Sequence, residues 1–240
     1  MSMKSGVVIT GGSAGIGLRI VEELLAAGFS VINLARRKVP IASDDIVDIE
    51  IDLTDRLALA SACEQLAASD ARVFIHNAGA IRPDLLGGID LADLDALNQL
   101  HLGAAIQIAE ALLPGMKAER FGRIVIISSR ASVGMQARSS YAATKAGQIA
   151  LARTWALELA PCGITVNTVA PGPIEATEMF HEIVPENSAM LEEMAAKIPV
   201  QRLGLPADVA QAVMFFIDRD NGFVTGQNLF VCGGTSIGSI

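Results

Sequence analysis

The sequence is poor in cysteine, in aromatic residues and in positive charge. Its 240 residues include three cysteines, Cys63, Cys162 and Cys232, which form no C-x-x-C pair and no cluster with histidine. This count and spacing argue against a disulfide framework or a metal site, and reduced thiols are typical of a cytoplasmic protein. The net charge of −8 disfavours a nucleic-acid surface, which requires a basic face. We therefore expect neither nucleic acid nor metal as a partner.

Long apolar runs are also missing. No stretch approaches the roughly 18 consecutive apolar residues of a membrane span, and the opening MSMKSGVVIT is too short in apolar residues for a signal peptide. These features predict a cytoplasmic protein without a membrane partner. Aromatic residues make up 4% of the chain and all hydrophobic residues 51%. The core must then be mainly aliphatic, as in a sheet whose strands are buried on both faces.

Short aliphatic runs alternate with segments of helical periodicity along the chain. We expect strands at residues 7–10, 29–35, 45–52, 72–79, 122–129, 163–172 and 227–234. We expect helices at residues 16–27, 55–69, 90–113, 140–160 and 206–218, with Pro114-Gly115 ending the third of them. This alternation predicts parallel strands joined by right-handed crossovers, and so an α/β fold with a doubly wound sheet and helices on both faces. Because no linker or internal repeat interrupts the pattern, we expect residues 1–240 to form one domain.

The stretch TGGSAGIG, from Thr10 to Gly17, admits two interpretations. It contains G-x-S-x-G, the turn that carries the nucleophilic serine of α/β-hydrolases, which would here be Ser13. That serine would need a histidine later in the chain, and His181 lies in an irregular segment. The alternative is a glycine-rich turn that seats a pyrophosphate at the N-terminus of the next helix. The position after the first strand favours the pyrophosphate turn.

Six further segments accompany this turn in a characteristic order. They are NAGA (77–80), GRIVIISS (122–129), YAATK (141–145), VNTVAPGPI (166–174), QRLGLPADVA (201–210) and VTGQNLFVCGG (224–234). With them, the sequence resembles the short-chain dehydrogenase/reductase family over nearly its whole length. The resemblance implies a Rossmann-like sheet of seven strands, a nicotinamide cofactor, redox chemistry between alcohols and carbonyl compounds, and a homodimer or homotetramer.

Tyr141 and Lys145 are the candidate catalytic pair. Reduction of a carbonyl needs a hydride, which a nicotinamide supplies, and a proton from the protein. The two residues are four positions apart, so they share one face of a helix, and a neighbouring ammonium group is expected to lower the pKa of the phenol. The resemblance implies that Tyr141 exchanges this proton. An exposed Tyr/Lys pair on an amphipathic helix would show the same spacing.

A serine and a histidine complete the candidate catalytic set. The strand pattern matches the family's serine to Ser129, whereas the commonest interval before Tyr141 points to Ser128. We expect Ser129, with Ser128 on the opposite side of the strand. Where the family usually has an asparagine that helps to hold a relay water, this sequence has His101. His101 is expected either to pack in the helix or to serve the same water, with a pH dependence near the ordinary pKa of histidine.

The basic residues after the second strand favour NADP over NAD as the cofactor. A carboxylate at this point would bind the ribose 2′-OH of NAD, but Ala35 occupies it, followed by Arg36 and Arg37, whose guanidinium groups suit a 2′-phosphate. A solvated basic loop is the alternative. The resemblance implies that the remaining cofactor contacts come from Gly11, Ser13, Gly15, Ile16, Gly17, Asp52, Leu53, Asn77, Ala78, Gly79, Tyr141, Lys145, Pro171, Gly172, Ile174 and Thr177. Thr177 stands one residue later than the family's threonine.

Residues 175–205 are predicted to form a lid over the substrate. The apolar side chains in this segment suit a pocket wall or a helix packed on the domain equally well: Met179, Phe180, Ile183, Met190, Leu191 and Met194. We expect an oxidoreductase that acts on an apolar ketone or alcohol. The alternatives are a reductase of 3-oxoacyl thioesters and a weakly catalytic protein that senses a nucleotide.

Overall fold

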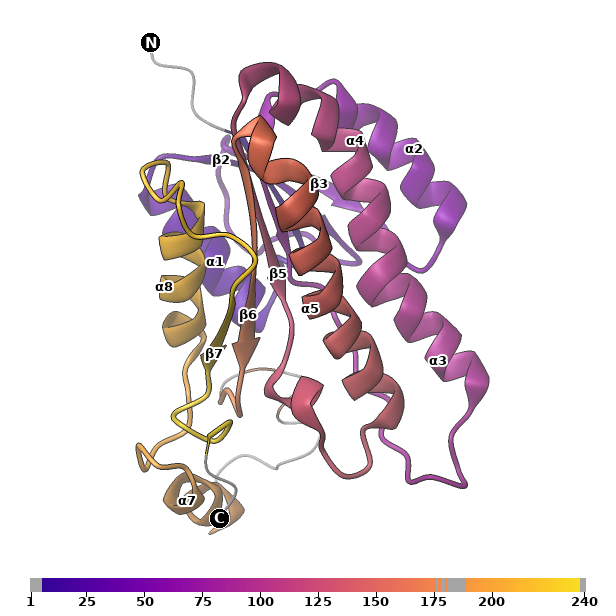
Figure 1. Ribbon diagram of the computed structural model, residues 1–240, viewed down its shortest axis with the longest axis vertical. Coiled ribbons are helices and arrows are strands. Elements are labelled where there is room, and N and C mark those ends of the chain that lie inside the picture. The colour runs from indigo at the N-terminus through magenta and orange to yellow at the C-terminus, as the bar shows by residue number, and fades with distance from the viewer. Residues whose placement is uncertain (1–5, 176, 178–179, 181–188, 238–240) are drawn as a thin grey trace.

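The computed structural model describes residues 6–175, 177, 180 and 189–237, and its seven strands form one sheet (Figure 1). The strands are β1 (Gly6–Thr10), β2 (Ser30–Ala35), β3 (Ile46–Glu50), β4 (Ala71–His76), β5 (Gly122–Ile127), β6 (Ile164–Pro171) and β7 (Asn228–Val231). Their spatial order is β3-β2-β1-β4-β5-β6-β7, and every neighbouring pair is parallel. The predicted doubly wound, Rossmann-like sheet is confirmed.

Helices cover both faces of the sheet. They are α1 (Gly15–Ala26), α2 (Arg56–Ala67), α3 (Leu91–Asn98), α4 (Ala104–Glu119), α5 (Ser139–Leu159), α7 (Ala189–Lys197) and α8 (Pro206–Ile217). In Figure 1, α1 and α8 lie on one side of the strands, and α2, α4 and α5 on the other. An aliphatic core fills each interface, with Val7 and Val213 in one and Val8 and Ile108 in the other. Within the described residues, no helix has both the length and the apolar character needed to cross a membrane.

The long central helix differs from the sequence prediction. It does not end at Pro114, because α4 continues to Glu119 with the proline inside it. The proline removes one helical hydrogen bond, but it lies on the exposed side while Leu112 and Met116 are buried in the core. Burial of these side chains offsets the lost bond. A π-helical turn at Gln99–Gly103, η1, also separates α3 from α4, and the sequence pattern did not predict it.

The carboxyl ends of the strands lie together at the lower end of Figure 1, near α7. The chain continues from β1 into a helix on one face of the sheet, and from the neighbouring β4 into helices on the other face (Figure 1). A ligand-binding crevice is therefore expected outside the carboxyl ends of these two strands. The glycine turn follows β1, the NAG segment follows β4, and Ser129 follows β5. Segments that are far apart in the sequence therefore meet at one edge of the sheet.

Candidate active site

The turn between β1 and α1 has a backbone that only glycine suits. Gly11 and Gly15 have positive φ angles of 69° and 52°, which L-residues with a side chain rarely adopt. A Cβ atom on Gly17 would lie 2.0 Å from the carbonyl oxygen of Gly11. Ser13 lies within this turn, and Ile16 packs partly buried at the start of α1. A tight, glycine-rich turn at a helix N-terminus fits the pyrophosphate of a dinucleotide.

Three polar residues hold this turn in place. Asn33 on β2 accepts a hydrogen bond from the backbone N–H of Gly12 at 2.8 Å, and Asn77 donates to the carbonyl of Gly11 at 2.9 Å. Thr10 Oγ1 accepts from the backbone N–H groups of Asn77 and Ala78, both at 3.0 Å. Thr10 and Asn33 were not predicted as site residues. Their signal was a polar side chain within a buried aliphatic strand, which needs a specific hydrogen-bond partner.

Ala35 and Arg36 lie where β2 ends, and Asp52 lies just beyond β3. Asp52 accepts hydrogen bonds from the backbone and hydroxyl of Thr54 at 2.9 and 2.7 Å. These bonds, with a smaller contribution from the positive charge of Arg36, lower the pKa of Asp52. Arg36 is exposed to solvent, so a guanidinium group is accessible at the position where a cofactor ribose would lie.

Two other predicted contacts of this region differ in their surroundings. Arg37 is exposed like Arg36. Leu53, in contrast, is buried in the core between the sheet and α2, and its carbonyl lies 3.5 Å from Gln99 Nε2. Its side chain therefore faces the core, and only its backbone could serve a ligand.

Tyr141 lies in a buried cluster at the start of α5. Its ring packs with Leu97, Ala131 and Ile81, and its hydroxyl lies near the side chain of Ser129. Burial raises the pKa of the phenol, although the nearby Ser129 hydroxyl and the positive charge of Arg138 oppose the change. The expected lowering of this pKa is thus wrong for the protein without cofactor, because desolvation outweighs the neighbouring charges.

Lys145 is completely buried one turn after Tyr141. Its Nζ donates to the carbonyl of Ile127 at 2.8 Å and lies 5.7 Å from the centre of the Tyr141 ring. Burial lowers the pKa of Lys145 to about 7. Near neutral pH, burial therefore makes the uncharged form of this lysine more accessible than it is in solvent.

The two candidate serines point in different directions. Ser128 is buried, and its hydroxyl donates to the backbone carbonyl of Lys145 at 2.8 Å. Ser129 instead faces Tyr141 and accepts a hydrogen bond from the backbone N–H of Ala131 at 3.1 Å. The alternation of side chains in extended backbone accounts for this separation. Ser129, Tyr141 and Lys145 come together, whereas Ser128 anchors the helix.

His101 lies in the π-helical turn and is fully buried. Its Nδ1 is 2.8 Å from Thr144 Oγ1, and its Nε2 is 3.3 Å from the backbone nitrogen of Ala80. Burial and the charge of Lys145 lower the pKa of His101 far below its usual range. The ring is therefore neutral at physiological pH, and the structure does not support a rate that changes near the ordinary pKa of histidine.

A second buried histidine, His76, was not predicted as part of the site. It ends β4, and its Nδ1 lies 3.1 Å from Thr10 Oγ1. Burial and the charge of Lys145 lower the pKa of His76 to about 3. The sequence did indicate an unusual position here, because His76 is a histidine within the otherwise mainly aliphatic strand RVFIH.

The nicotinamide end of the predicted cofactor site is formed by the exit of β6. Pro171 is the last residue of the strand, and a Cβ on Gly172 would lie 2.8 Å from the Cα of Cys232. Ile174 is buried beyond it. Thr177 lies beside the glycine turn, because a Cβ on Gly15 would come within 3.2 Å of its methyl carbon. Its late position in the sequence therefore does not keep Thr177 away from the predicted pyrophosphate site.

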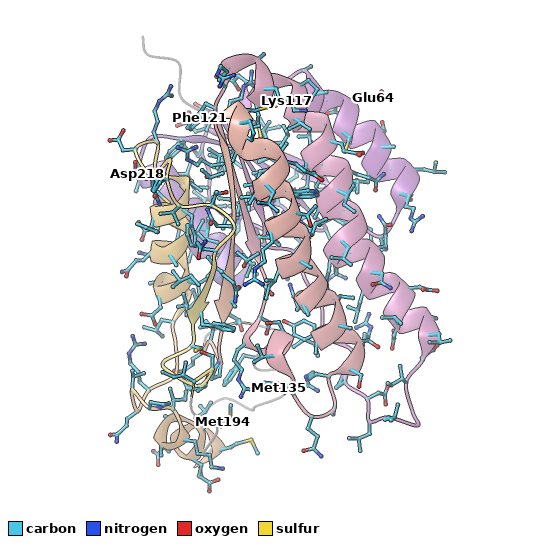
Figure 2. The ribbon with its side chains drawn as sticks, viewed as in Figure 1. Glu64, Lys117, Phe121, Met135, Met194 and Asp218 are labelled. Carbon is cyan, nitrogen blue, oxygen red and sulfur yellow. The ribbon has the colours of Figure 1, made fainter. Side chains whose placement is uncertain are left out.

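The described part of the predicted lid is fastened at its base. Glu175 N–H donates to the carbonyl of Gly204 at 2.8 Å, and Gly204 N–H donates to Pro173 at 3.0 Å. No side chain of α7 is fully buried, so this helix covers the strand ends without entering the core. Figure 2 shows Met194 of α7 and Met135 at the same end of the molecule. Met179, His181 and Ile183 lie outside the described residues.

Comparison with known proteins gives consistent matches. The sequence profile of a family described as "Enoyl-(Acyl carrier protein) reductase" matches residues 11–236. The chain is 34% identical to the 3-oxoacyl-[acyl-carrier-protein] reductase FabG of Haemophilus influenzae, over 95% of this chain and 96% of that protein. It is 32% identical to the (2S)-[(R)-hydroxy(phenyl)methyl]succinyl-CoA dehydrogenase subunit BbsD of Thauera aromatica, over 96% of both chains. The solved structure "ElxO with NADP Bound" superposes with a TM-score of 0.89 at 29% identity, covering 97% of this chain and 98% of that one.

Proposed function

The chain belongs to the short-chain dehydrogenase/reductase family, and from this membership we propose how its residues act. The protein is an oxidoreductase that transfers a hydride between a nicotinamide cofactor and an alcohol or ketone. The observation that carries the assignment of roles is the meeting of Ser129, Tyr141 and Lys145. We assign the substrate oxygen to the hydroxyl groups of Ser129 and Tyr141.

NADP(H) is the cofactor that this site suits best. The bound nicotinamide supplies or accepts the hydride. Gly11, Gly15 and Gly17 allow the close packing of the turn that would receive the pyrophosphate, and Asn77 holds this turn. The absence of a carboxylate at Ala35 and the exposed guanidinium of Arg36 favour a 2′-phosphate. The NADP bound to ElxO supports the same choice.

In the reduction direction, Tyr141 donates the proton to the carbonyl oxygen. The Ser129 hydroxyl donates a hydrogen bond to the same oxygen and orients it. Lys145, held by the carbonyl of Ile127, places a positive charge near the phenol when it is protonated. This charge favours the phenolate that forms as the proton leaves. In the oxidation direction, Tyr141 accepts the proton instead.

We propose an apolar ketone or alcohol as the substrate, enclosed by residues 175–205. A 3-oxoacyl thioester is the second candidate, because the names of FabG and BbsD both specify acyl groups on a carrier protein or coenzyme A. The test follows NADPH absorbance with acetoacetyl thioesters and with simple ketones of matched length. Turnover of the thioesters alone favours the second candidate. Tight NADPH binding without turnover of any substrate would contradict both and favour a nucleotide-sensing protein.

We also propose that the protein forms a homo-oligomer. Strand β7 lies at one of the two edges of the sheet, and Leu229 on it is partly exposed. Phe223 is fully exposed, and Phe215 on the neighbouring α8 is about half exposed. Apolar side chains beside an unpaired strand edge are typical of an interface between subunits.

A further inference from the structure

Three segments of the chain meet at the imidazole ring of His101. Thr144 on α5 contacts one ring nitrogen, and the backbone N–H of Ala80, after β4, contacts the other. The ring also packs edge-on against Tyr141, with 5.8 Å between ring centres. Thr144 lies between Tyr141 and Lys145 in the sequence, and Ala80 directly follows the NAG segment. One side chain thus joins the helix that carries the candidate catalytic pair to the loop assigned to the cofactor.

The partners of the ring determine where its proton lies. The N–H of Ala80 can only donate, so Nε2 must present a lone pair. Thr144 Oγ1 lies 3.1 and 3.0 Å from the carbonyl oxygens of Ser140 and Tyr141. Its hydroxyl proton is directed to these oxygens, so the hydroxyl accepts a hydrogen bond from Nδ1–H. His101 is neutral with its proton on Nδ1, and both of its nitrogens are engaged by the protein.

The same reasoning gives His76 the opposite tautomer. Thr10 Oγ1 already accepts two backbone hydrogen bonds, from Asn77 and Ala78. Its own proton is therefore donated to Nδ1 of His76 at 3.1 Å, which leaves the histidine proton on Nε2. The titratable groups around His101 are His76 from β4, with Lys145 and Tyr141 from α5. Protonation of His101 would add a second buried charge beside Lys145, which disfavours it.

Gly79 provides the space that this arrangement needs. A Cβ at this position would lie 3.2 Å from His101 Nε2 and 3.4 Å from Lys145 Nζ. The His101 ring therefore approaches this stretch of backbone from the π-helical turn, and the Lys145 ammonium group approaches it from α5. A movement of the NAG segment would therefore change the surroundings of both His101 and Lys145.

We propose that His101 is a positioning residue, a neutral clamp that couples the cofactor loop to the helix carrying Tyr141 and Lys145, and that its side chain does not hold a relay water. This inference rests on the proposed function, since it concerns the geometry of that site. The clamp needs both hydrogen bonds. At position 101, an asparagine can place a hydrogen-bond donor only near the place of Nδ1, and a glutamine can place an acceptor only near the place of Nε2. Each substitution therefore restores only one of the two hydrogen bonds.

The first test observes the tautomers directly. The chain has three histidines, His76, His101 and His181, so long-range ¹H–¹⁵N spectra can be assigned with single His→Asn variants. We expect His101 to be protonated on Nδ1 and His76 on Nε2, with no change from about pH 6 to about pH 8.5. A charged His101, or one protonated on Nε2, would overturn the proposal. This measurement does not depend on turnover.

The second test breaks one end of the clamp with a matched pair of substitutions. Thr144→Val removes the hydroxyl with little change of shape, and Thr144→Ser keeps the hydroxyl. We expect Thr144→Val and His101→Ala each to lower kcat and NADPH affinity about tenfold, with substrate KM nearly unchanged, and Thr144→Ser to resemble the wild type. Quenching of Trp155, the only tryptophan, reports NADPH binding. The double variant should be no worse than His101→Ala alone.

The outcomes separate this inference from the proposed function. If no substrate is reduced but the tautomers and the coupled loss of NADPH affinity are found, the clamp stands and the proposed function fails. If the wild type is active and the Thr144→Val and His101→Ala variants keep both kcat and NADPH affinity, the clamp is wrong. Additive effects in the double variant would also contradict it. His101→Gln, which keeps the acceptor for Ala80, replaces His101→Ala if circular dichroism shows that the alanine variant does not fold.

Discussion

Tyr141 is the only tyrosine in the chain, so its phenolate absorbance can be followed without interference from other tyrosines. Burial raises the pKa of this phenol above its ordinary value in the protein without cofactor. We therefore expect little phenolate at about pH 10, where an exposed tyrosine is half ionised. Oxidised cofactor adds positive charge, so adding NADP⁺ should lower the midpoint of the absorbance titration. A midpoint at or below the ordinary value before NADP⁺ is added would contradict this account.

The residue at the end of β2 should determine the choice of cofactor. We expect Ala35→Asp to weaken NADPH binding by at least about tenfold, because a carboxylate there repels the 2′-phosphate. NADH binding should be unchanged or improved, since the same carboxylate can bind the 2′-OH. Binding of both reduced cofactors is measured by fluorescence. Arg36→Ala is the companion variant, which should weaken NADPH binding and leave NADH binding near the wild-type value.

At the scale of an element, the close packing of α1 against the turn before it depends on glycine at position 17. In Gly17→Ala, the methyl group would meet the carbonyl of Gly11. We expect a loss of stability of about 1–3 kcal/mol and at least about tenfold weaker NADPH binding, measured by urea unfolding and by fluorescence titration. Gly222→Ala is the control, because its Cβ would approach only Arg123 Nη2 at 3.8 Å. Wild-type NADPH affinity in Gly17→Ala would show that the cofactor does not use this turn.

Elements also differ in how far their sequence predicted them. The strands and the glycine turn follow from local patterns of aliphatic residues and glycine. The π-helical turn around His101 does not follow from such a pattern, and its His101 contacts residues of other segments. Gln148, which lies on α5, donates a hydrogen bond of 3.0 Å to the carbonyl of His101. Likewise, Pro114 is tolerated in α4 because its neighbours are buried, a fact that local propensity does not contain.

At the scale of the whole molecule, two buried histidines make stability depend on pH. Both have pKa values below their ordinary value in the folded chain, that of His76 about 3. As the pH falls below about 6.5, the unfolded chain binds protons that the folded chain does not, so stability decreases. We expect a loss of up to about 2.7 kcal/mol per pH unit from the two groups together, measured by urea unfolding between about pH 6 and about pH 5, where Lys145 is mostly protonated in the folded and the unfolded chain. His76→Asn should remove about half of this dependence, and an unchanged slope would show that His76 is protonated in the fold.

The assembly can be tested at the apolar surface beside β7. We expect Phe223→Glu to shift the protein toward monomers, because it places a charge in the proposed contact between subunits. Light scattering after size-exclusion chromatography gives the mass. Leu57→Glu, at an exposed position on α2, is the matched control and should keep the wild-type mass. A wild type that is already monomeric would contradict the proposal.

By itself, the sequence determined the order of strands and helices, the family and the nicotinamide chemistry, because these depend on short local patterns of residues along the chain. The roles assigned to the individual site residues remain predictions. Only the tertiary structure decided which serine faces Tyr141, where Thr177 lies, and that burial raises the pKa of the phenol. These properties arise where side chains from distant segments exclude water and exchange hydrogen bonds. Desolvation depends on all the groups around a site, so no local pattern of residues contains it.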